Sequence, residues 1–330
     1  MGLFSDLTKA FGSVRQEFLI LNLEVYGVKS CILNWLKYYL HNRKQRVVLQ
    51  FVNSSNLLLD WEIVRHGVRQ GSVLGPLLFN MYINDFPCII NKISHTILFA
   101  DGTNILVSSS DLNELNSKLN SVLCCISKWF QINQLVLNLI KIYIVKFASS
   151  KLLTYPLNFV YNSRDLTVTE NIIFLSTHLD CNLIWKSHID NIIQKTEFSL
   201  LPVKKIITHY KCESVMYGLF CRFYSHISYG IVFWGSSSSI RNVFIIQKGE
   251  IRIMLRLCSR SSCREGFKKL DILPVPCLYI YALVLFAVKN LNIYQINSSV
   301  HDMNKRQQNK LHIHSVRLSS IRRDVYFSSV

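Results

Sequence analysis

The pattern of apolar and polar positions divides the chain into a mixed first half and a largely helical second half. Two helices are predicted between Val14 and Leu40, because apolar residues recur at helical spacing on either side of a break at Gly27. A third helix is predicted from Ser110 to Asn133, where Asp111 and Glu114 form a capping pair. From Lys186 to Ile293 the pattern is again helical, with turns at 235–239 and 274–276.

Strands are predicted between these helices. The segment 41–51 has a basic turn followed by an alternating strand, and 57–64 is expected to pair with it as a hairpin. The strand predicted at 135–147 carries Lys141. A further hairpin is predicted where two apolar runs, 96–100 and 105–107, flank Asp101–Gly102, since an Asp-Gly pair favours a tight turn. The tip of this hairpin is therefore expected to carry a carboxylate.

A second carboxylate, Asp6, follows the short apolar stretch Gly2–Phe4 and is expected to end a strand. Taken alone, Asp101 in an Asp-Gly pair is better explained as a turn residue. Together the two aspartates are what a two-metal phosphoryl-transfer site requires, because Mg²⁺ prefers carboxylate oxygens and keeps water and phosphate as its other ligands. Because so little chain precedes Asp6, we expect the sequence to begin inside a domain.

Charge and hydropathy bear on the partners of the chain. Its 330 residues include 37 Lys and Arg against 20 Asp and Glu, a formal net charge of +17 that favours an acidic polymer such as nucleic acid. The mean hydropathy of +0.23 raises a membrane alternative. However, the longest apolar run, Cys277–Val288, is shorter than the roughly 20 residues that a spanning helix needs. We therefore expect a buried core helix there and no stable membrane insertion.

The cysteines and the start of the chain indicate an intracellular protein. The 10 cysteines include no C-x-x-C pair, so we expect no zinc site and reduced, mostly buried thiols. The first residues lack the charged region and cleavage site of a secretory signal. The expected location is the nucleus or the cytoplasm, and not the outside of the cell.

Five sequence blocks occur in a characteristic order. They are DLTKAF (6–11), YLHNRKQRV (39–47), GVRQGSVLGPLLFNMYIND (67–85), LFADGTNIL (98–106) and WFQINQLVLNLIK (129–141). In this order they resemble the reverse transcriptase of non-LTR, LINE-type retrotransposons, in particular the jockey-like group. The resemblance continues through FLSTHLDCNLIWKSHI (174–189), SYGIVFWGSSS (228–238) and VHDMNKRQQNKLHIHS (300–315), and so covers nearly the whole chain.

The resemblance implies an α+β fold, with a polymerase palm made of an antiparallel sheet backed by helices, followed by a mainly helical thumb-like region. We expect residues 1–150 to form the palm with partial fingers, and residues 151–200 to end the palm. The latter should include a hairpin similar to the family's primer grip, pairing 174–179 with 183–185 across Asp180–Asn182. Residues 201–294 would form the thumb-like region and residues 295–330 a basic, mobile tail. In the family the fingers and an endonuclease precede this point, so we expect an N-terminally truncated copy.

By motif position, the resemblance also implies three groups of site residues. Asp6, Asp101 and Lys141 would act in catalysis. The two aspartates and the carbonyl of Leu7 would hold Mg²⁺, or Mn²⁺ in its place, and Lys141 would lie near the departing pyrophosphate. The incoming dNTP would be bound by Leu7, Phe11, Gln70, Gly71 and Ser72, and the RNA template and DNA primer by Arg43, Gln45 and Leu175. A core position for Phe11 and solvated positions for Arg43, Gln45 and Lys141 are the alternatives.

Departures from the family pattern bear on activity. Gly102 stands where the family has a second Asp at the hairpin tip, Gly12 where it has Asp, Arg69 where it usually has Pro, and Ser176 where it usually has Gly. The implied function is an RNA-directed DNA polymerase that adds dNTPs to a primer 3′-hydroxyl, and this copy is expected to be impaired. The alternatives are a catalytically dead remnant with non-specific nucleic-acid binding, and an apolar product that associates with membranes or aggregates. The sequence identifies no protein partner.

Overall fold

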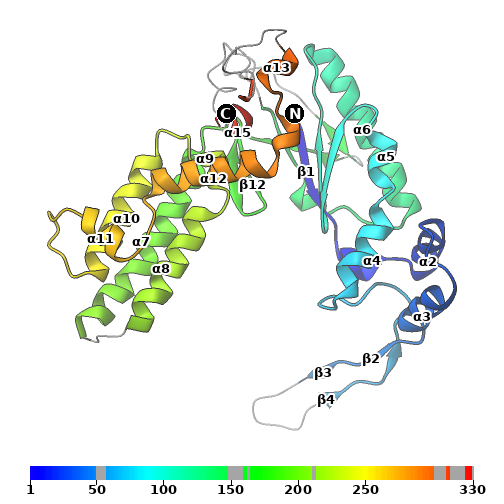
Figure 1. Cartoon of the computed structure of the whole chain (residues 1–330). Helices are drawn as coiled ribbons and strands as arrows, with labels where there is room; N and C mark the ends of the chain where they lie inside the picture. Colours follow the sequence, from blue (N-terminus) through cyan, green and yellow to red (C-terminus); the bar gives the residue numbers. More distant parts are fainter. Residues whose placement is uncertain are drawn as a thin grey trace. The chain divides into compact units, whose positions relative to one another are not determined.

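The computed structural model describes residues 1–49, 57–147, 159–161, 164–209, 213–300, 310–312 and 324–328. The chain forms two compact units, which we call unit 1 (Met1–Glu170) and unit 2 (Asn171–Val330) (Figure 1). Unit 1 combines a sheet with helices, whereas unit 2 is mainly helical. This confirms the predicted α+β class; the four-part division of the chain stays a prediction.

A five-stranded sheet organises unit 1. In spatial order its strands are β11 (Thr167–Thr169), β8 (Tyr143–Val145), β1 (Gly2–Asp6), β7 (Gly102–Leu106) and β6 (His95–Phe99). Neighbouring strands are antiparallel, except that β11 runs parallel to β8. Because β1 is the central strand, its end carries Asp6 to the turn of the β6–β7 hairpin.

Unit 1 also contains short and long helices. They are α1 (Ala10–Ser13), α2 (Gln16–Val25), α3 (Ser30–Leu40), α4 (Leu74–Ile83), α5 (Phe86–Ile90), α6 (Leu112–Ile132) and the 3-10 helix η1 (Leu139–Lys141). The predicted break between α2 and α3 is confirmed, and Gly27 takes a φ of 87° there. The predicted cap of α6 is also confirmed, since the Glu114 N–H donates to the Asp111 carboxylate at 2.9 Å.

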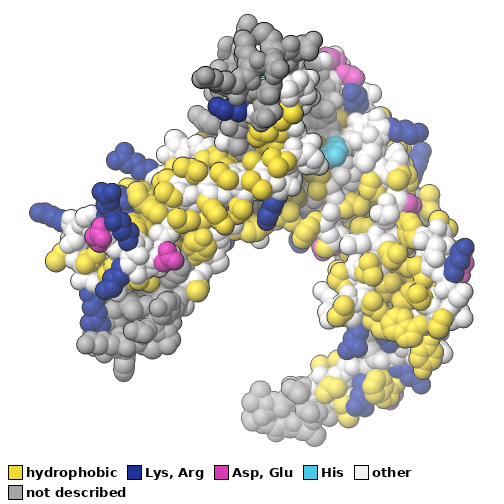
Figure 2. Space-filling view, in the orientation of Figure 1, with side chains coloured by type: hydrophobic (Ala, Val, Ile, Leu, Met, Phe, Trp, Pro, Cys, Tyr) yellow, Lys and Arg dark blue, Asp and Glu magenta, His cyan; other side chains and the backbone are white. Residues whose placement is uncertain are grey.

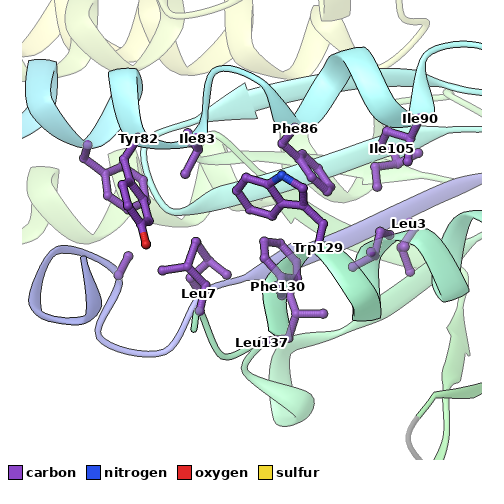
Figure 3. Packing of buried hydrophobic residues seen from close by; sticks show 14 of the residues in the cluster. Leu3, Leu7, Tyr82, Ile83, Phe86, Ile90, Ile105, Trp129, Phe130 and Leu137 are labelled. Carbon is purple, nitrogen blue, oxygen red and sulfur yellow. The ribbon is translucent and has the colours of Figure 1, made fainter. Parts of the chain in front are cut away.

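The core of unit 1 lies between the sheet and α6 (Figure 3). Phe86 packs against Trp129 and Phe130, with ring centroids 4.8 and 5.3 Å apart. Leu3 and Ile105, from the two strands that lead to the aspartates, are buried in the same cluster. The strand ends that carry the aspartates are therefore anchored by a continuous apolar core.

An arm extends from the end of α3, away from the sheet of unit 1 (Figure 1). We define the arm as residues 43–49 and 57–64. Its strands are β2 (Lys44–Gln45), β3 (Val48–Leu49), β4 (Leu57–Leu58) and β5 (Glu62–Ile63), and β2 pairs with β5 and β3 with β4, both antiparallel. The predicted hairpin is thus confirmed. A further two-stranded sheet joins β9 (Val160–Tyr161) to β10 (Arg164–Asp165).

Unit 2 begins with a hairpin and continues as helices. The hairpin pairs β12 (Asn171–Phe174) with β13 (Thr177–Asp180). The helices are α7 (Lys186–His209), α8 (Glu213–Ser228), α9 (Ile231–Trp234), α10 (Ile240–Met254), α11 (Arg264–Lys269), α12 (Val275–Lys289), η3 (Leu291–Ile293), α13 (Asn297–Val300) and α15 (Val325–Ser328). The core is built around the fully buried Trp234, whose indole N–H donates to the Tyr229 carbonyl at 3.0 Å. The predicted helical pattern is confirmed.

The predicted position of the first hairpin in unit 2 is wrong. The turn falls at Leu175–Ser176, where both residues take left-handed φ values of 44° and 64°, and not at Asp180–Asn182. Asp180 instead accepts hydrogen bonds from the N–H groups of Ile184 and Trp185, at 2.8 and 2.7 Å. Its carboxylate therefore closes the loop between β13 and α7. The residues 183–185, predicted as the second strand of the hairpin, belong to this loop.

Two predictions about burial also need correction. α12 buries Leu278 and Leu283 but leaves Ile280 59% and Val288 60% exposed, so this apolar helix is only partly a core helix. Among the nine cysteines in the described part of the chain, six are exposed, so the prediction of mostly buried thiols is wrong; all nine are free thiols. In the described ranges, no helix has both the length and the apolar content to cross a membrane. Most of the predicted tail, 295–330, lies outside the described residues.

Candidate active site

The central strand and the β6–β7 hairpin bring Asp6 and Asp101 together. Asp6 is the last residue of β1 and pairs with Gly102, and the Leu7 N–H donates to the Asp101 carbonyl at 3.1 Å. The hairpin turn is Ala100–Asp101, one residue earlier than predicted, and Ala100 takes a φ of 50°. Gly102 is therefore the first residue of β7, and Asp101 stands at the tip beside the end of β1.

The backbone of Leu7 is oriented toward the hairpin tip. Leu7 faces Leu137 in an antiparallel bridge whose hydrogen bonds run from Thr8 N to Val136 O, at 2.8 Å, and from Asn138 N to Asp6 O, at 2.9 Å. In such a pair the N–H and C=O of the facing residue point away from the partner strand. Within the described ranges no N–H donates to the Leu7 carbonyl oxygen. This oxygen is therefore available beside the two aspartates.

Lys141 reaches the same place from η1. Its Nζ lies 3.0 Å from Asp6 Oδ2, and both side chains are about half exposed. The hydrogen bond and charge of Asp6 raise the pKa of Lys141, with a smaller contribution from the charge of Asp101. The ammonium is therefore protonated at neutral pH and lies within the field of both carboxylates. The prediction that Lys141 lies in a strand is wrong, because η1 precedes β8.

Asn138 is a site residue that the sequence reasoning missed. Its N–H holds the Asp6 carbonyl, its side chain accepts from Ile140 N at 3.2 Å, and its carbonyl accepts from Lys141 N at 2.9 Å. Asn is favoured where a side chain replaces a backbone acceptor in a turn. An Asn three residues before Lys141 was thus a signal for the turn that places this lysine.

The oxygen atoms at this site suit a divalent cation, but they are few. Carboxylates and a carbonyl are the donors that Mg²⁺ prefers. Among the residues that the structure describes, no group of three or more His, Cys, Asp or Glu side chains could hold a metal ion. A Cβ at Gly102 would lie 3.8 Å from Asp6 Oδ1 and 3.2 Å from the Phe99 carbonyl oxygen. A side chain at this position would therefore point into the same site.

The loop before α4 is fixed against the segment after β1. Val68 N donates to the Phe11 carbonyl at 2.8 Å, and Gly67 N to the Val14 carbonyl at 2.7 Å. Gly67 has a φ of 81°, and a Cβ there would come within 2.9 Å of the Phe11 carbonyl oxygen. Gly75 is equally constrained, because its Cβ would lie 2.5 Å from the Arg69 carbonyl oxygen. Glycine is therefore required at both ends of this loop.

The predicted nucleotide-binding residues lie on this loop and on α1. Phe11 is partly buried, with its ring centroid 5.0 Å from that of Phe79, so it belongs to the margin of the core. Ser72 Oγ donates to the Arg69 carbonyl at 2.7 Å and accepts from Gly75 N at 3.0 Å. Its hydroxyl is thus engaged within the turn, whereas Gln70 and Gly71 are exposed.

The three predicted template or primer residues belong to the arm and to unit 2. Arg43 and Gln45 are on the arm, where Gln45 is exposed and pairs with Glu62. Leu175 lies in unit 2, at the tip of the β12–β13 turn, and its carbonyl accepts from the Tyr229 hydroxyl at 2.7 Å. The structure thus brings together Asp6, Leu7, Asp101 and Lys141, and the roles of all these residues stay predictions.

Comparison with known proteins decides the family. Residues 1–179 match the family described as reverse transcriptase (RNA-dependent DNA polymerase). The chain belongs to the reverse transcriptase family. The resemblance predicted from its ordered blocks is thereby confirmed, and reverse transcriptases generally use Mg²⁺.

Individual relatives extend this comparison. A protein described as a probable RNA-directed DNA polymerase from transposon BS, from Drosophila melanogaster, is 31% identical over 138 residues. The match covers 38% of this reverse transcriptase chain and 14% of the Drosophila protein, so the chain spans a small part of that relative.

Solved telomerase structures show a weaker similarity. The telomerase of Candida albicans in complex with a fragment of telomeric RNA has a TM-score of 0.42 and 10% identity, covering 83% of this chain and 51% of that one. Apo telomerase from Candida tropicalis has a TM-score of 0.39 and 11% identity, and the match covers 93% of this chain and 52% of the telomerase chain.

Proposed function

We propose that unit 1 is the palm of an RNA-directed DNA polymerase from a non-LTR transposon, and that this copy catalyses poorly. The observation that carries the proposal is the strand register, which sets Asp6 at the end of β1 beside Asp101 at the tip of the β6–β7 hairpin. Membership of the reverse transcriptase family and a relative named for a transposon support it. The reaction would add dNTPs to a primer 3′-hydroxyl, with RNA as the template.

The proposed metal ligands are Asp6, Asp101 and the carbonyl oxygen of Leu7, which would hold Mg²⁺ or Mn²⁺. When bound, such ions activate the primer hydroxyl and neutralise the charge on the transferred phosphate. Lys141 holds a proton at Nζ, and its place beside Asp6 lets it donate to the departing pyrophosphate. Phe11 packs on Phe79 and would support the sugar of the nucleotide. The exposed Gln70 and Gly71, with the backbone of Ser72, would contact its base.

The same geometry supports poor catalysis. Gly102 supplies no carboxylate, so two carboxylates would have to balance two divalent ions, which together would carry four positive charges. Lys141 already provides one cation at Asp6 Oδ2, which weakens that oxygen as a ligand. Groups that position charge in a transition state each contribute about 10²- to 10³-fold in rate, so the loss of one is severe.

Nucleic acid is the partner class that reverse transcriptases share, and the net charge of +17 fits it. We propose an RNA template and a DNA primer as the specific partners, bound inside the cell in the nucleus or cytoplasm. A second candidate function is nucleic-acid binding without catalysis. The observation in its favour is Gly102, which leaves the hairpin tip with a single aspartate.

Primer extension on an RNA template tests the proposal and separates the two candidates. The purified chain is compared with Asp101→Asn and Gly102→Asp in Mg²⁺ and in Mn²⁺. We expect weak extension that Asp101→Asn abolishes and Gly102→Asp raises at least tenfold. Extension that is unaffected by Asp101→Asn would refute the site, and binding without extension in all three proteins would favour the second candidate.

A further inference from the structure

The arm of unit 1 is a two-stranded structure that exposes apolar side chains. Val48 and Leu49 of β3, and Leu57 and Leu58 of β4, are between 43% and 52% exposed. Isolated two-stranded hairpins are marginally stable in water. Figure 2 shows hydrophobic and basic side chains next to each other on this arm. Such a surface is suited to contact a partner.

The register of the arm sorts its side chains onto two faces. Lys44 pairs with Ile63, and Gln45 pairs with Glu62. Because side chains alternate along a strand and facing residues share a face, Lys44 and Ile63 lie on one face and Gln45 and Glu62 on the other.

Arg46 and Trp61 extend the face that carries Lys44. Two residues beyond Lys44, Arg46 places its guanidinium carbon 4.7 Å from the centroid of the Trp61 ring. We call Lys44, Arg46, Trp61 and Ile63 the basic face of the arm. Gln45, predicted to contact the template, lies on the opposite face.

The basic face is available to a ligand. None of the ion pairs formed by the described residues involves Lys44 or Arg46. Trp61 is 58% exposed even with the guanidinium stacked on it. The face therefore offers two cations without an ion-pair partner next to an exposed aromatic ring.

We infer that the basic face binds single-stranded nucleic acid, with a base stacked on Trp61 and the flanking phosphates neutralised by Lys44 and Arg46. Aromatic rings next to a basic surface are how proteins hold single strands, because every base has a π-face and every nucleotide a charge. Bases within a duplex are already stacked on each other and cannot reach the indole. A second copy of this chain would set the same cations against each other. The inference is independent of the proposed catalysis, because this binding needs no divalent ion.

Binding of labelled oligonucleotides by the full chain in EDTA tests the inference. Fluorescence anisotropy would measure the affinity for a short oligouridylate, a short oligothymidylate and a duplex. We expect Trp61→Ala to weaken single-strand binding about tenfold, in line with the loss of one stacked base, while Trp61→Phe retains most of it. Trp35→Ala is the matched control, since Trp35 is 52% exposed in the same unit and stacks on Tyr39.

The salt dependence of binding distinguishes the contribution of Lys44 and Arg46 from that of the Trp61 ring. With Lys44→Gln and Arg46→Gln combined, the slope of log affinity against log salt should fall by about 1.4, because each phosphate of a single strand that a cation neutralises adds about 0.7 to this slope. Equal losses of affinity in Trp61→Ala and Trp35→Ala, or an unchanged slope in the double variant, would overturn the inference. So would a dimer, seen by sedimentation, that Trp61→Ala converts to a monomer. Circular dichroism checks that the variants keep their helices.

Discussion

Replacing Gly102 by Asp restores a carboxylate at the position where the structure lacks one. The Cβ of the new side chain would lie 3.8 Å from Asp6 Oδ1 and 3.2 Å from the Phe99 carbonyl oxygen. The backbone at Gly102 is not in the left-handed region, so an L side chain needs no change of φ. The substitution therefore adds charge to the site with a small steric adjustment of the hairpin.

The magnitude follows from two opposed effects. Without metal, carboxylates about 5 Å apart repel by about 1–3 kcal/mol at effective dielectric constants of 80–20. Since Asp6 is about half exposed, the lower end applies, and we expect Gly102→Asp to lower the free energy of unfolding by about 1 kcal/mol. With a divalent ion the sign reverses, because each tenfold gain in affinity adds about 1.4 kcal/mol when the ion is in excess.

Urea unfolding of the wild-type chain, Gly102→Asp and Gly102→Asn, each with and without Mn²⁺, measures both effects. Gly102→Asn is the matched control, because it has the same shape and the same contact with Phe99 but no charge. We expect Mn²⁺ to stabilise Gly102→Asp by about 1–2 kcal/mol more than either other protein. An equal effect of Mn²⁺ on Gly102→Asp and Gly102→Asn would refute the view that position 102 faces a metal site.

Three further predictions concern unit 2. Ser176→Gly should raise the free energy of unfolding by about 1 kcal/mol, because Ser176 has a left-handed φ of 64°; an unchanged urea midpoint would contradict this. Gln247→Leu should lower the free energy of unfolding by about 2–4 kcal/mol, because the Gln247 amide donates to the Leu273 carbonyl and accepts from the Val275 N–H, both at 2.9 Å. Native hydrogen exchange at the start of α12 measures this loss, and unchanged protection there would contradict the prediction. Burial raises the pKa of Glu250 to about 9 from 4.5, so the folded state keeps a proton that the unfolded chain loses, and stability should fall as pH rises through that window. Glu250→Gln should remove this decrease of stability with pH, which hydrogen exchange in α10 would measure between about pH 5 and pH 8. A decrease equal to that of the wild type would contradict the raised pKa of Glu250.

Local signals in the sequence predicted the parts of the fold that local physics determines. The helix α6 follows from its apolar spacing, and its start follows from the side chain of Asp111. The β6–β7 hairpin follows from two apolar runs around a short polar turn, although the turn lies one residue earlier than predicted. Asp-Gly favours a turn, but the register is set by the pairing of β7 with β1 through its whole length, which a local signal does not contain.

Other features depend on contacts between distant segments. The ion pair of Lys141 with Asp6 joins residues 135 positions apart, and it requires the turn at Asn138 as well as the bridge to Leu137. The Leu175–Ser176 turn contains no glycine or asparagine that would have predicted it. The Tyr229 hydroxyl, in the turn between α8 and α9, donates to the Leu175 carbonyl and holds this conformation. Tertiary contacts of this kind override local propensity, so the sequence alone placed this hairpin incorrectly.

The most direct test of the candidate site is the binding of Mn²⁺ to the intact chain, followed by electron paramagnetic resonance without nucleic acid. If Asp6 and Asp101 share an ion, Asp6→Asn and Asp101→Asn should each weaken binding at least tenfold, and Asp111→Asn, at the α6 cap, should leave it unchanged. Mn²⁺ binding that survives both substitutions, or that depends on one aspartate alone, would contradict the paired site on which the proposed polymerase function rests.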